Sequence, residues 1–316
     1  MLKGMTRLHA ISPGVSLEVA VHTDRGLERE ENQDTPFLAL LPGAVVAAVC
    51  DGMGGAAGGQ IASSQAAFAL EEHLTGAALV NEEAAARALH DALGAATRRV
   101  FELAKGTPRL NGMGTTATLV AVLGERLVLA QVGDSRAYLL RKGELTQLTR
   151  DQTLAQLMVE RGQLAPEEVA TFPHANVILQ AVGTTESVEV DLRSIGLYRD
   201  DVLLLCSDGL HGPVDDALIA DVLANVEDPA KACAALVGRA LAAGAPDNVT
   251  CIVGRVRGDG LGVAPSPEVY VTQCILDELP ASSEKEEAQV RDVPEKAPLS
   301  LLWPLRWGPW ASKKTP

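Results

Sequence analysis

Short runs of apolar and β-branched residues recur along the chain and predict strands, because such side chains suit a pleated surface that is at least half buried. These runs cover residues 17–22, 44–50, 115–123, 127–132, 137–140, 202–206 and 249–256. Between them lie alanine-rich segments in which apolar residues recur at helical spacing. The predicted helices cover residues 59–74, 82–103, 216–223 and 229–242.

The order of these elements predicts an α+β fold. Two long predicted helices follow the second strand, and two more precede the last strand. Consecutive helices separated by groups of strands do not give the regular strand–helix alternation of a parallel sheet. We therefore expect largely antiparallel sheets with pairs of helices packed outside them. Residues 148–191 interrupt this order with a short helix, a turn and a loop, and we interpret them as an inserted lid or flap.

The two ends of the chain differ in composition from the middle. We interpret residues 1–15 as an N-terminal extension. After Val256 the composition changes to Gly, Pro, Ser and Glu, which is typical of a mobile linker. Residues 258–316 are therefore expected to form a flexible linker that ends in a tryptophan-rich tail.

The tail contains all three tryptophans of the chain, Trp303, Trp307 and Trp310. Their spacing is helical, but Pro304 and Pro309 interrupt any continuous helix. Aromatic rings beside arginine and lysine are typical of an anchor at a membrane surface or of a peptide that docks on a partner protein. A tail that folds back over an apolar patch of the same chain would explain this composition equally well.

Charge and cysteine content narrow the classes of function. A net charge of −14 argues against nucleic acid as the main partner, because phosphate backbones are bound by clustered Lys and Arg. It fits a protein that gathers cations, although an acidic surface also serves solubility. The five cysteines are far apart, lie mostly in apolar runs and lack the spacing of a zinc site, so we expect reduced core residues. They are Cys50, Cys206, Cys233, Cys251 and Cys274.

Neither a secretory signal nor a membrane span is evident in the sequence. The first residues, MLKGMTRLHAISPG, contain no long apolar stretch. No window approaches the roughly 18 apolar residues that a spanning helix requires. We therefore expect a cytoplasmic location.

Aspartates stand beside several of the predicted strands. Asp51, Asp134 and Asp208 follow the apolar runs AVVAAVC, LVLAQVG and VLLLCS, and Asp247 directly precedes the last run. If these strands are neighbours, their ends place several carboxylates at one rim of a sheet. Such crowding requires a compensating cation or raised pKa values, and carboxylate oxygens suit Mg²⁺ or Mn²⁺.

Each of these positions also has a plainer interpretation. Asp-Gly after a strand is an ordinary turn signal, so Asp51 or Asp208 taken alone indicates a turn more readily than a site. Only the combination of four positions favours a metal site. The glycines at 52, 54, 55, 58 and 59 match neither the lysine-bearing loop of nucleotide hydrolases nor the dinucleotide fingerprint, and we interpret them as a close backbone approach beside a metal.

Six short motifs then occur in order along the chain. They are R-E-E-N-Q-D at 29–34, D-G-M-G-G at 51–55, G-T-T at 114–116, G-D-S-R at 133–136, S-D-G-L at 207–210 and D-N-V-T at 247–250. Over residues 16–257 this set resembles the bacterial branch of the PP2C-type (PPM) protein phosphatases. The resemblance implies a four-layer α/β/β/α sandwich with a metal cluster in a cleft at one end.

The resemblance also implies a function. The protein is expected to hydrolyse phosphoserine and phosphothreonine on protein substrates, by attack of a water or hydroxide that bridges two metal ions. The ions would be Mn²⁺ or Mg²⁺, with a weaker third ion beside the pair. The enzyme would oppose a bacterial Ser/Thr kinase and act as a monomer.

The resemblance assigns a role to each candidate residue. Asp51 would bridge both metals, and the carbonyl of Gly52 would join the second metal. Asp208 and Asp247 would hold the first metal. Asp34 would bind the cluster directly or through its waters, Asp134 would help to hold the third ion, and Arg29 would grip the substrate phosphate, because its planar fork suits phosphate oxygens.

The chain departs from the commonest family pattern at three positions, which are Gln33, Ala56 and Gln152. Gln33 removes a negative charge near the second metal, and the other two replace histidines, so no general acid is identifiable. His211 lies within a motif, but a lone histidine is more often structural than catalytic.

Three other functions remain open at this point. One is a regulator of the same fold that binds phosphoproteins without turnover, which the retention of all five aspartates disfavours. Another is a nucleotide-binding protein, which would need a lysine near residues 52–59, where the sequence has none. The third is a scaffold whose function lies in the tail.

Overall fold

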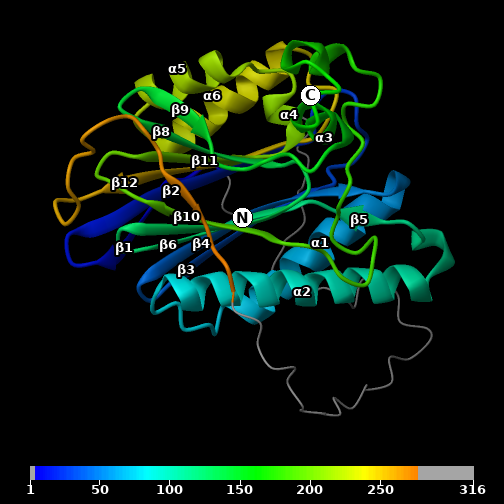
Figure 1. The fold of residues 1–316 in the computed structure, drawn as a ribbon, viewed down its shortest axis with the longest axis horizontal. Coiled ribbons are helices and arrows are strands. Elements are labelled where there is room, and N and C mark those ends of the chain that lie inside the picture. Colours follow the sequence, from blue (N-terminus) through cyan, green and yellow to red (C-terminus); the bar gives the residue numbers. More distant parts are fainter. Residues whose placement is uncertain (1–3, 277–316) are drawn as a thin grey trace, which may run out of the picture. The chain divides into compact units, whose positions relative to one another are not determined.

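The structure is a computed structural model that describes residues 4–276, apart from the side chains of Ala56, Ala57 and Ala170. Two antiparallel sheets form its centre (Figure 1). The six-stranded sheet has the order β1 (Arg7–Ser12), β2 (Val15–Asp24), β12 (Val249–Arg257), β11 (Val202–Cys206), β8 (Arg136–Arg141) and β9 (Glu144–Gln147). The seven-stranded sheet has the order β13 (Val271–Gln273), β10 (Asp191–Gly196), β7 (Arg126–Val132), β6 (Ala117–Leu123), β4 (Ala44–Met53) and β3 (Asp34–Leu41), with the short β5 (Gly114–Thr115) also paired to β4.

Helices cover the outer face of each sheet. The helices α1 (Gly55–Leu74) and α2 (Glu82–Gly106) pack on the seven-stranded sheet, and α5 (Asp216–Asn225) and α6 (Pro229–Ala242) pack on the other (Figure 1). The shorter elements are η1 (Pro108–Leu110), α3 (Leu154–Glu160), η2 (Pro166–Thr171) and α4 (Asp208–His211). The expected four-layer sandwich with flanking helix pairs is confirmed.

Strand β4 shows why the sequence folds in this way. Its residues alternate between two cores, so that Val45 and Ala47 face the other sheet while Val46 and Ala48 face the helices α1 and α2. A strand that is buried on both faces must be apolar at every position, and the run AVVAAVC satisfies this requirement. Asp51 lies near the end of the same strand, which places a carboxylate at the rim of the sheet.

The edges of both sheets were not predicted from the pattern. Strand β1 lies inside the expected N-terminal extension 1–15 and pairs with β2. Strand β13 lies inside the expected linker 258–316 and pairs with β10. Edge strands are covered on one side only, so they lack the apolar run that marks an internal strand. The tryptophans Trp303, Trp307 and Trp310 lie outside the described residues.

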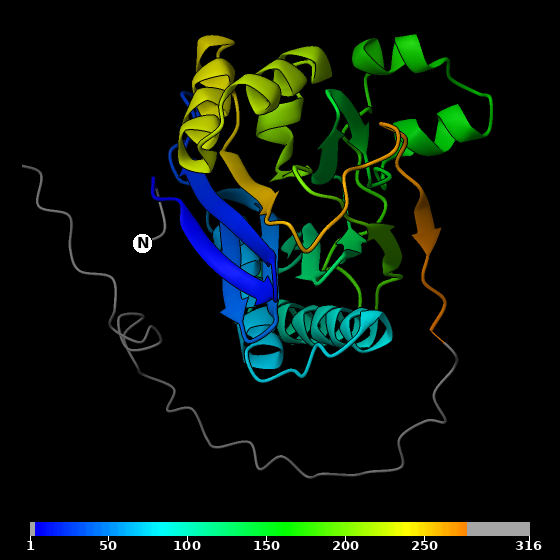
Figure 2. The ribbon, with the colours of Figure 1, turned by 90° about the vertical axis from the view of Figure 1, so that its left-hand side faces the viewer.

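The segment 148–191 contains α3, η2 and a returning loop that lies beside the sheets (Figure 2). Its two halves are joined near the base, where Leu154 N donates to Val177 O at 2.9 Å and Leu179 N donates to Gln152 O at 2.8 Å. These bonds fix the loop at 176–178 beside the ends of the central strands. None of the helices within residues 4–276 combines the length and the hydrophobicity of a transmembrane segment.

Candidate metal centre

Two carboxylates face each other across neighbouring strands at the rim of the seven-stranded sheet. Asp34 begins β3 and pairs directly with Asp51 of β4 in the antiparallel register. Side chains of such a pair lie on the same face and close together, and like charges there repel each other. The sheet register therefore forces two aspartates together, as the position of Asp51 after an apolar strand had suggested.

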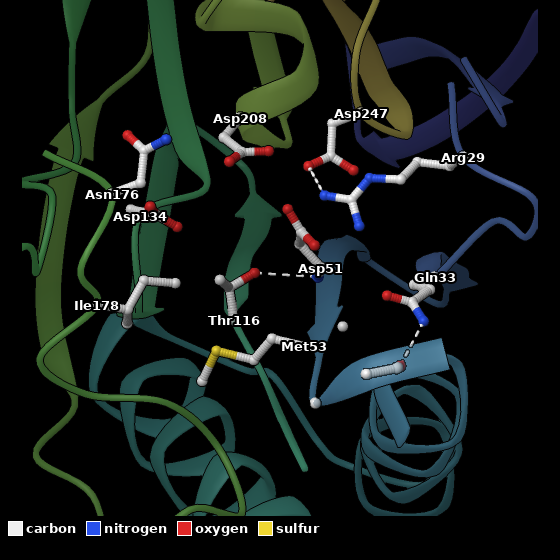
Figure 3. A pocket seen from close by; sticks show the side chains of 13 residues that line it. Arg29, Gln33, Asp51, Met53, Thr116, Asp134, Asn176, Ile178, Asp208 and Asp247 are labelled. Carbon is white, nitrogen blue, oxygen red and sulfur yellow. Dashed lines mark hydrogen bonds and ion pairs between the residues drawn. The ribbon is translucent and has the colours of Figure 1, made fainter. Parts of the chain in front are cut away.

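The G-T-T motif holds Asp51 in place. The hydroxyl of Thr116 accepts a hydrogen bond from Asp51 N at 3.0 Å, and Thr116 N donates to Asp51 O at 2.8 Å. The hydroxyl of Thr115 donates to the same carbonyl at 2.8 Å. With its backbone fixed by these bonds, Asp51 presents its side chain to the pocket (Figure 3).

Glycine is required next to Asp51 because two backbones approach closely. A Cβ on Gly52 would lie 2.0 Å from Gly59 O and 2.8 Å from Gln33 O, which no side chain can tolerate. Helix α1 begins at Gly55, after Gly54 with a φ of 124°. The glycine run therefore brings the start of α1 against the rim that carries Asp51, as the sequence predicted.

Asp208 and Asp247 come from two loops that are packed tightly together. Asp208 begins α4, directly after β11, and Asp247 lies just before β12. A Cβ on Gly209 would lie 2.0 Å from Asn248 O, so only glycine allows this contact. Asn248 also accepts from Gln33 N at 2.8 Å and donates to the carbonyls of Arg25 and Glu31, which ties both loops to the segment that leads to Asp34.

A buried hydroxyl links Asp34 to the other strands. Ser207 Oγ donates to Asp34 Oδ2 at 2.7 Å and accepts from Thr250 N at 3.0 Å. The second oxygen of Asp34 is buried without a hydrogen-bond partner among the described residues, and the Oδ1 of Asp208 is in the same state. Two buried carboxylate oxygens without partners are costly, and a bound cation would satisfy them.

Asp134 approaches from the loop between β7 and β8 and is only 6% exposed. His211 Nε2 lies 3.2 Å from the carbonyl oxygen of Asp134, a hydrogen bond in the tautomer that carries the proton on Nε2. Burial lowers the pKa of His211 to about 4, so the ring is neutral at pH 7. His211 therefore positions the Asp134 loop, which agrees with the structural interpretation of this histidine.

The site residues line one pocket of about 420 Å³ (Figure 3). All the candidate residues except Asp34 line it: Arg29, Asp51, Gly52, Asp134, Asp208 and Asp247. Arg29 Nη2 contacts Asp247 Oδ2 at 2.6 Å, so a cationic group already neutralises one of the carboxylates. Asn176 and Ile178 of the flap line the opposite side of the pocket (Figure 3).

Burial and mutual repulsion disfavour the ionised form of these carboxyl groups. Burial, opposed by the hydrogen bond from Ser207 and increased by Asp208 and Asp247, raises the pKa of Asp34 to about 7. Burial and the charges of Asp208 and Asp151 raise the pKa of Asp134 to about 7. The pKa values of Asp51 and Asp208 are raised by burial first and by neighbouring carboxylates second.

The chemistry of this site fits a hard divalent cation. Within residues 4–276 no three acidic, histidine or cysteine side chains are arranged to enclose an ion as they stand. Four of the carboxylates instead line a pocket, and two buried carboxylate oxygens lack partners among the described residues. Burial first, and then the neighbouring carboxylates, raise the pKa values of Asp51 and Asp34. Oxygen ligands of this kind suit Mn²⁺ and Mg²⁺.

Sequence reasoning missed the residues that support this site. Thr116, Ser207 and Asn248 lie inside three of the quoted motifs, so the signal was available, but their roles depend on contacts between distant segments. Asn176 and Ile178 carry no motif at all. Only the return path of the flap loop places them at the pocket.

The sequence model of the family described as "Protein phosphatase 2C" matches residues 22–244. This range holds the site residues from Arg29 to Asp208 and ends just before Asp247. The chain belongs to the protein phosphatase 2C family. The expected resemblance is thereby confirmed.

Two curated relatives show how far the similarity extends. The serine/threonine protein phosphatase PstP of Mycobacterium tuberculosis is 40% identical over 244 residues, which are 76% of this chain and 45% of that protein. The chain thus spans less than half the length of PstP. The serine/threonine phosphatase stp of Listeria welshimeri is 32% identical over 233 residues, which are 73% of this chain and 92% of that protein.

Solved structures of protein phosphatase 2C members share the fold. The crystal structure of Mycobacterium tuberculosis PstP has a TM-score of 0.70 at 37% identity and covers 76% of this chain and 98% of the other. The catalytic domain of PstP in complex with two manganese ions has a TM-score of 0.69 at 36% identity, and it covers 77% of this chain and 99% of the other. The metal-binding roles of individual residues in this chain stay predictions.

Proposed function

We propose that this member of the protein phosphatase 2C family hydrolyses phosphoserine and phosphothreonine in proteins with the help of Mn²⁺ or Mg²⁺. The observation that carries the proposal is a pocket lined by four aspartates and Arg29, with Asp34 paired to Asp51 beside it. Two buried oxygens of this group have no hydrogen-bond partner among the described residues. Relatives named as serine/threonine phosphatases, one with two manganese ions bound, support it.

The aspartates around the pocket are the proposed ligands of the metal ions. Asp51 is central because it lies opposite Asp34 in the sheet and lines the pocket with Asp208 and Asp247. We propose that these aspartates and the carbonyl of Gly52 hold two cations, and that Asp134 helps to hold a third. Bound cations would lower the pKa of a water and neutralise charge on the phosphoryl oxygens.

Arg29 is proposed to bind the phosphate of the substrate. Its guanidinium is half exposed and has one acidic contact among the described residues, Asp247. If a cation takes over Asp247, the planar fork becomes available for two charge-assisted hydrogen bonds to a phosphate. Arg29 would then orient the phosphorus without taking part in proton transfer.

The flap is proposed to select the polypeptide around the phosphorylated residue. Asn176 and Ile178 provide one amide and one apolar side chain on the side of the pocket opposite Arg29 (Figure 3). They could contact residues that flank the phosphate, while the aspartates act on the phosphate alone. The natural substrates are proposed to be phosphoproteins of a Ser/Thr kinase pathway.

A direct test uses a phosphothreonine peptide and an assay for released phosphate. The protein is expected to be active with added Mn²⁺, inactive after chelation and active again when Mn²⁺ is restored. Asp51→Asn should remain inactive under all conditions, whereas Asp91→Asn, an exposed change on α2, should behave like the wild type. Activity that persists in excess chelator, or that is lost on cysteine alkylation with metal present, would refute the proposal.

A further inference from the structure

A second pocket, of about 280 Å³, lies at the end of the six-stranded sheet opposite the aspartates; we call it the distal pocket. The strand directions establish this placement. Asp134 precedes β8 and Arg141 ends it, while Val202 begins β11 and Asp208 follows it. The distal pocket is lined by Arg141 and Val202, so it lies a full strand length from the candidate metal centre.

The distal pocket is built on one rung of the sheet, that is, on residues that pair directly across three neighbouring strands. Leu140, Val202 and Arg255 are direct neighbours in the antiparallel register of β8, β11 and β12, so their side chains share the face that α5 covers. Leu223 of α5, the β8–β9 turn and the segment around Val263 complete the lining. A buried arginine on an otherwise apolar rung requires partners for its charge.

Arg255 does not have those partners among the described residues. It is only 7% exposed, and its Nη2 donates to the carbonyls of Leu223 at 2.5 Å and Val226 at 2.6 Å, near the end of α5. These bonds account for one nitrogen. The Nε is buried and has no acceptor, and no carboxylate pairs with the guanidinium within residues 4–276. Burial, followed by the charge of Arg257, lowers the pKa of Arg255.

The other charges of the lining leave an excess of cations. Arg141 and Asp201 neutralise each other at 2.6 Å. Among the described residues, Lys142 contacts only the carbonyl of Pro265, at 3.4 Å, and Arg199 lies 3.9 Å from Asp200. Lys142, Arg199 and Arg255 thus face the single remaining carboxylate of Asp200, which also contacts Arg257 at 3.6 Å. In a chain with a net charge of −14, such a cationic pocket indicates an anionic ligand.

We propose that the distal pocket binds a small oxyanion, a phosphate or carboxylate group carried by inorganic phosphate or by a small metabolite. The ligand accepts hydrogen bonds from the guanidinium of Arg255 and is held at the mouth by Lys142 and Arg199. The volume suits this class, because a water occupies about 30 Å³ and a small oxyanion fits with several waters. This inference does not depend on the proposed phosphatase activity.

The test measures anion binding by the full-length, metal-free protein after the chelator has been removed by desalting, because a chelator is itself a polyanion. Inorganic phosphate, sulfate and succinate are titrated separately by calorimetry at constant ionic strength, since salt screens charge. At least one of them should bind saturably. Phosphate and sulfate without succinate would identify a tetrahedral anion, and succinate without the other two would identify a carboxylate.

Variants locate the binding. Lys142→Gln and Arg199→Gln lie at the surface of the pocket and should each weaken binding about tenfold, the effect of one charge-assisted hydrogen bond. Arg255→Gln should abolish anion binding, but it also removes the hydrogen bonds from Arg255 to α5. If the Arg255→Gln variant does not fold, the affinities of Lys142→Gln and Arg199→Gln test the proposal. Arg98→Gln on α2 and Arg29→Gln at the other pocket are the controls and should bind like the wild type.

Three results would overturn the proposal. The first is that none of the three anions binds saturably. The second is unchanged affinity in both Lys142→Gln and Arg199→Gln. The third is that Arg29→Gln abolishes the binding, which would place the anion at the candidate metal centre.

Discussion

The buried ion pair of Arg141 and Asp201 and the aspartates of the candidate metal centre differ in whether their charges are compensated. Arg141 and Asp201 are 3% and 1% exposed, contact each other at 2.6 Å and have their remaining atoms satisfied by Gly196 O, Glu268 O and Tyr198 N. Of the aspartates at the other end, Asp34 and Asp134 are also buried, but this group is mutually repulsive. Two buried oxygens of the group, on Asp34 and Asp208, have no partner among the described residues. Charge that is fully satisfied stabilises a fold, whereas charge left without compensation indicates a site that awaits a ligand.

The largest expected effect separates activity from stability at the aspartate group. Asp51→Asn and Asp208→Asn should each lower kcat by about 10²–10³-fold or more, because they remove oxygens proposed to hold the cations. The same changes relieve repulsion, so the metal-free variants should melt no lower than the metal-free wild type. Turnover of a phosphothreonine peptide and thermal melting measure the two effects. If Asp51→Asn or Asp208→Asn lost activity only because the variant unfolded, these aspartates would contribute to stability and not to activity alone, contrary to this prediction.

Breaking the buried pair of Arg141 and Asp201 should lower stability and leave activity unchanged. Asp201→Asn leaves the charge of Arg141 buried without its partner and should lower the free energy of unfolding by about 3–5 kcal/mol. The fraction that remains folded should keep its kcat. Glu82→Gln, which breaks the exposed pair with Arg126 at 2.9 Å, is the matched control and should cost less than about 1 kcal/mol. Denaturant unfolding measures both.

The pH dependence of stability should also reveal the aspartate group. The pKa values of Asp34 and Asp134 are raised to about 7 in the folded protein from an ordinary value of 3.8, so the folded state holds protons that the unfolded state has lost. Stability from these groups is present at low pH and is lost as the pH rises toward 7. His211, with its pKa lowered to about 4, acts in the opposite direction below about pH 6.5, but it is one group against two.

Metal-free protein should therefore melt roughly 10 °C lower at pH 8 than at pH 5, and the stabilisation by added Mn²⁺ should grow over the same interval. Asp134→Asn should reduce the slope. A melting temperature of the metal-free protein that rises steadily between pH 5 and 8 would show that these carboxyl groups are not protonated in the fold.

Arg29→Ala should have a smaller and more selective effect. It removes the proposed phosphate contact, so KM for a phosphopeptide should rise about tenfold while kcat changes less. It also frees Asp247, so the Mn²⁺ concentration needed for half-maximal activity should fall. A large loss in kcat with unchanged KM would instead place Arg29 among the groups that act only in the transition state.

The smallest expected effect concerns the flap. Ile178→Ala should raise KM for a phosphopeptide by about three- to fivefold, since it removes one apolar contact, and should leave hydrolysis of a small aryl phosphate unchanged. Leu179→Ala, in the same loop but outside the metal-centre pocket, is the control. Equal losses for peptide and aryl phosphate would show that Ile178 shapes the aspartate site itself.

The sequence predicted the buried elements better than the edges. The run at 202–206 coincides with β11, and the run at 44–50 lies within β4, because strands buried on both faces must be apolar throughout. The pattern missed β3, an edge strand that carries Pro36 and is only partly buried at most of its positions. It also missed β13, three exposed residues whose position depends on β10 rather than on their own composition.

The site was predicted in part for a similar reason. Aspartates beside strands are visible in the sequence, and the motifs named Asp34, Asp51, Asp208 and Asp247 together. The contacts that hold them, such as Ser207 with Asp34 or Asn248 with Gln33, join residues 173 and 215 positions apart. No local pattern encodes such contacts, because they exist only once both sheets have formed.

The pairing of β2 with β12 has a consequence for synthesis of the chain. Residues 15–24 lie against residues 249–257 in the finished sheet (Figure 2). On the ribosome, β2 emerges more than 200 residues before its partner strand. Until then its apolar residues Leu17, Val19 and Val21 are exposed to solvent or packed against non-native neighbours. Asp247 arrives with that last strand. The nascent protein can therefore neither close its first sheet nor assemble the aspartate pocket until translation of the domain is almost complete.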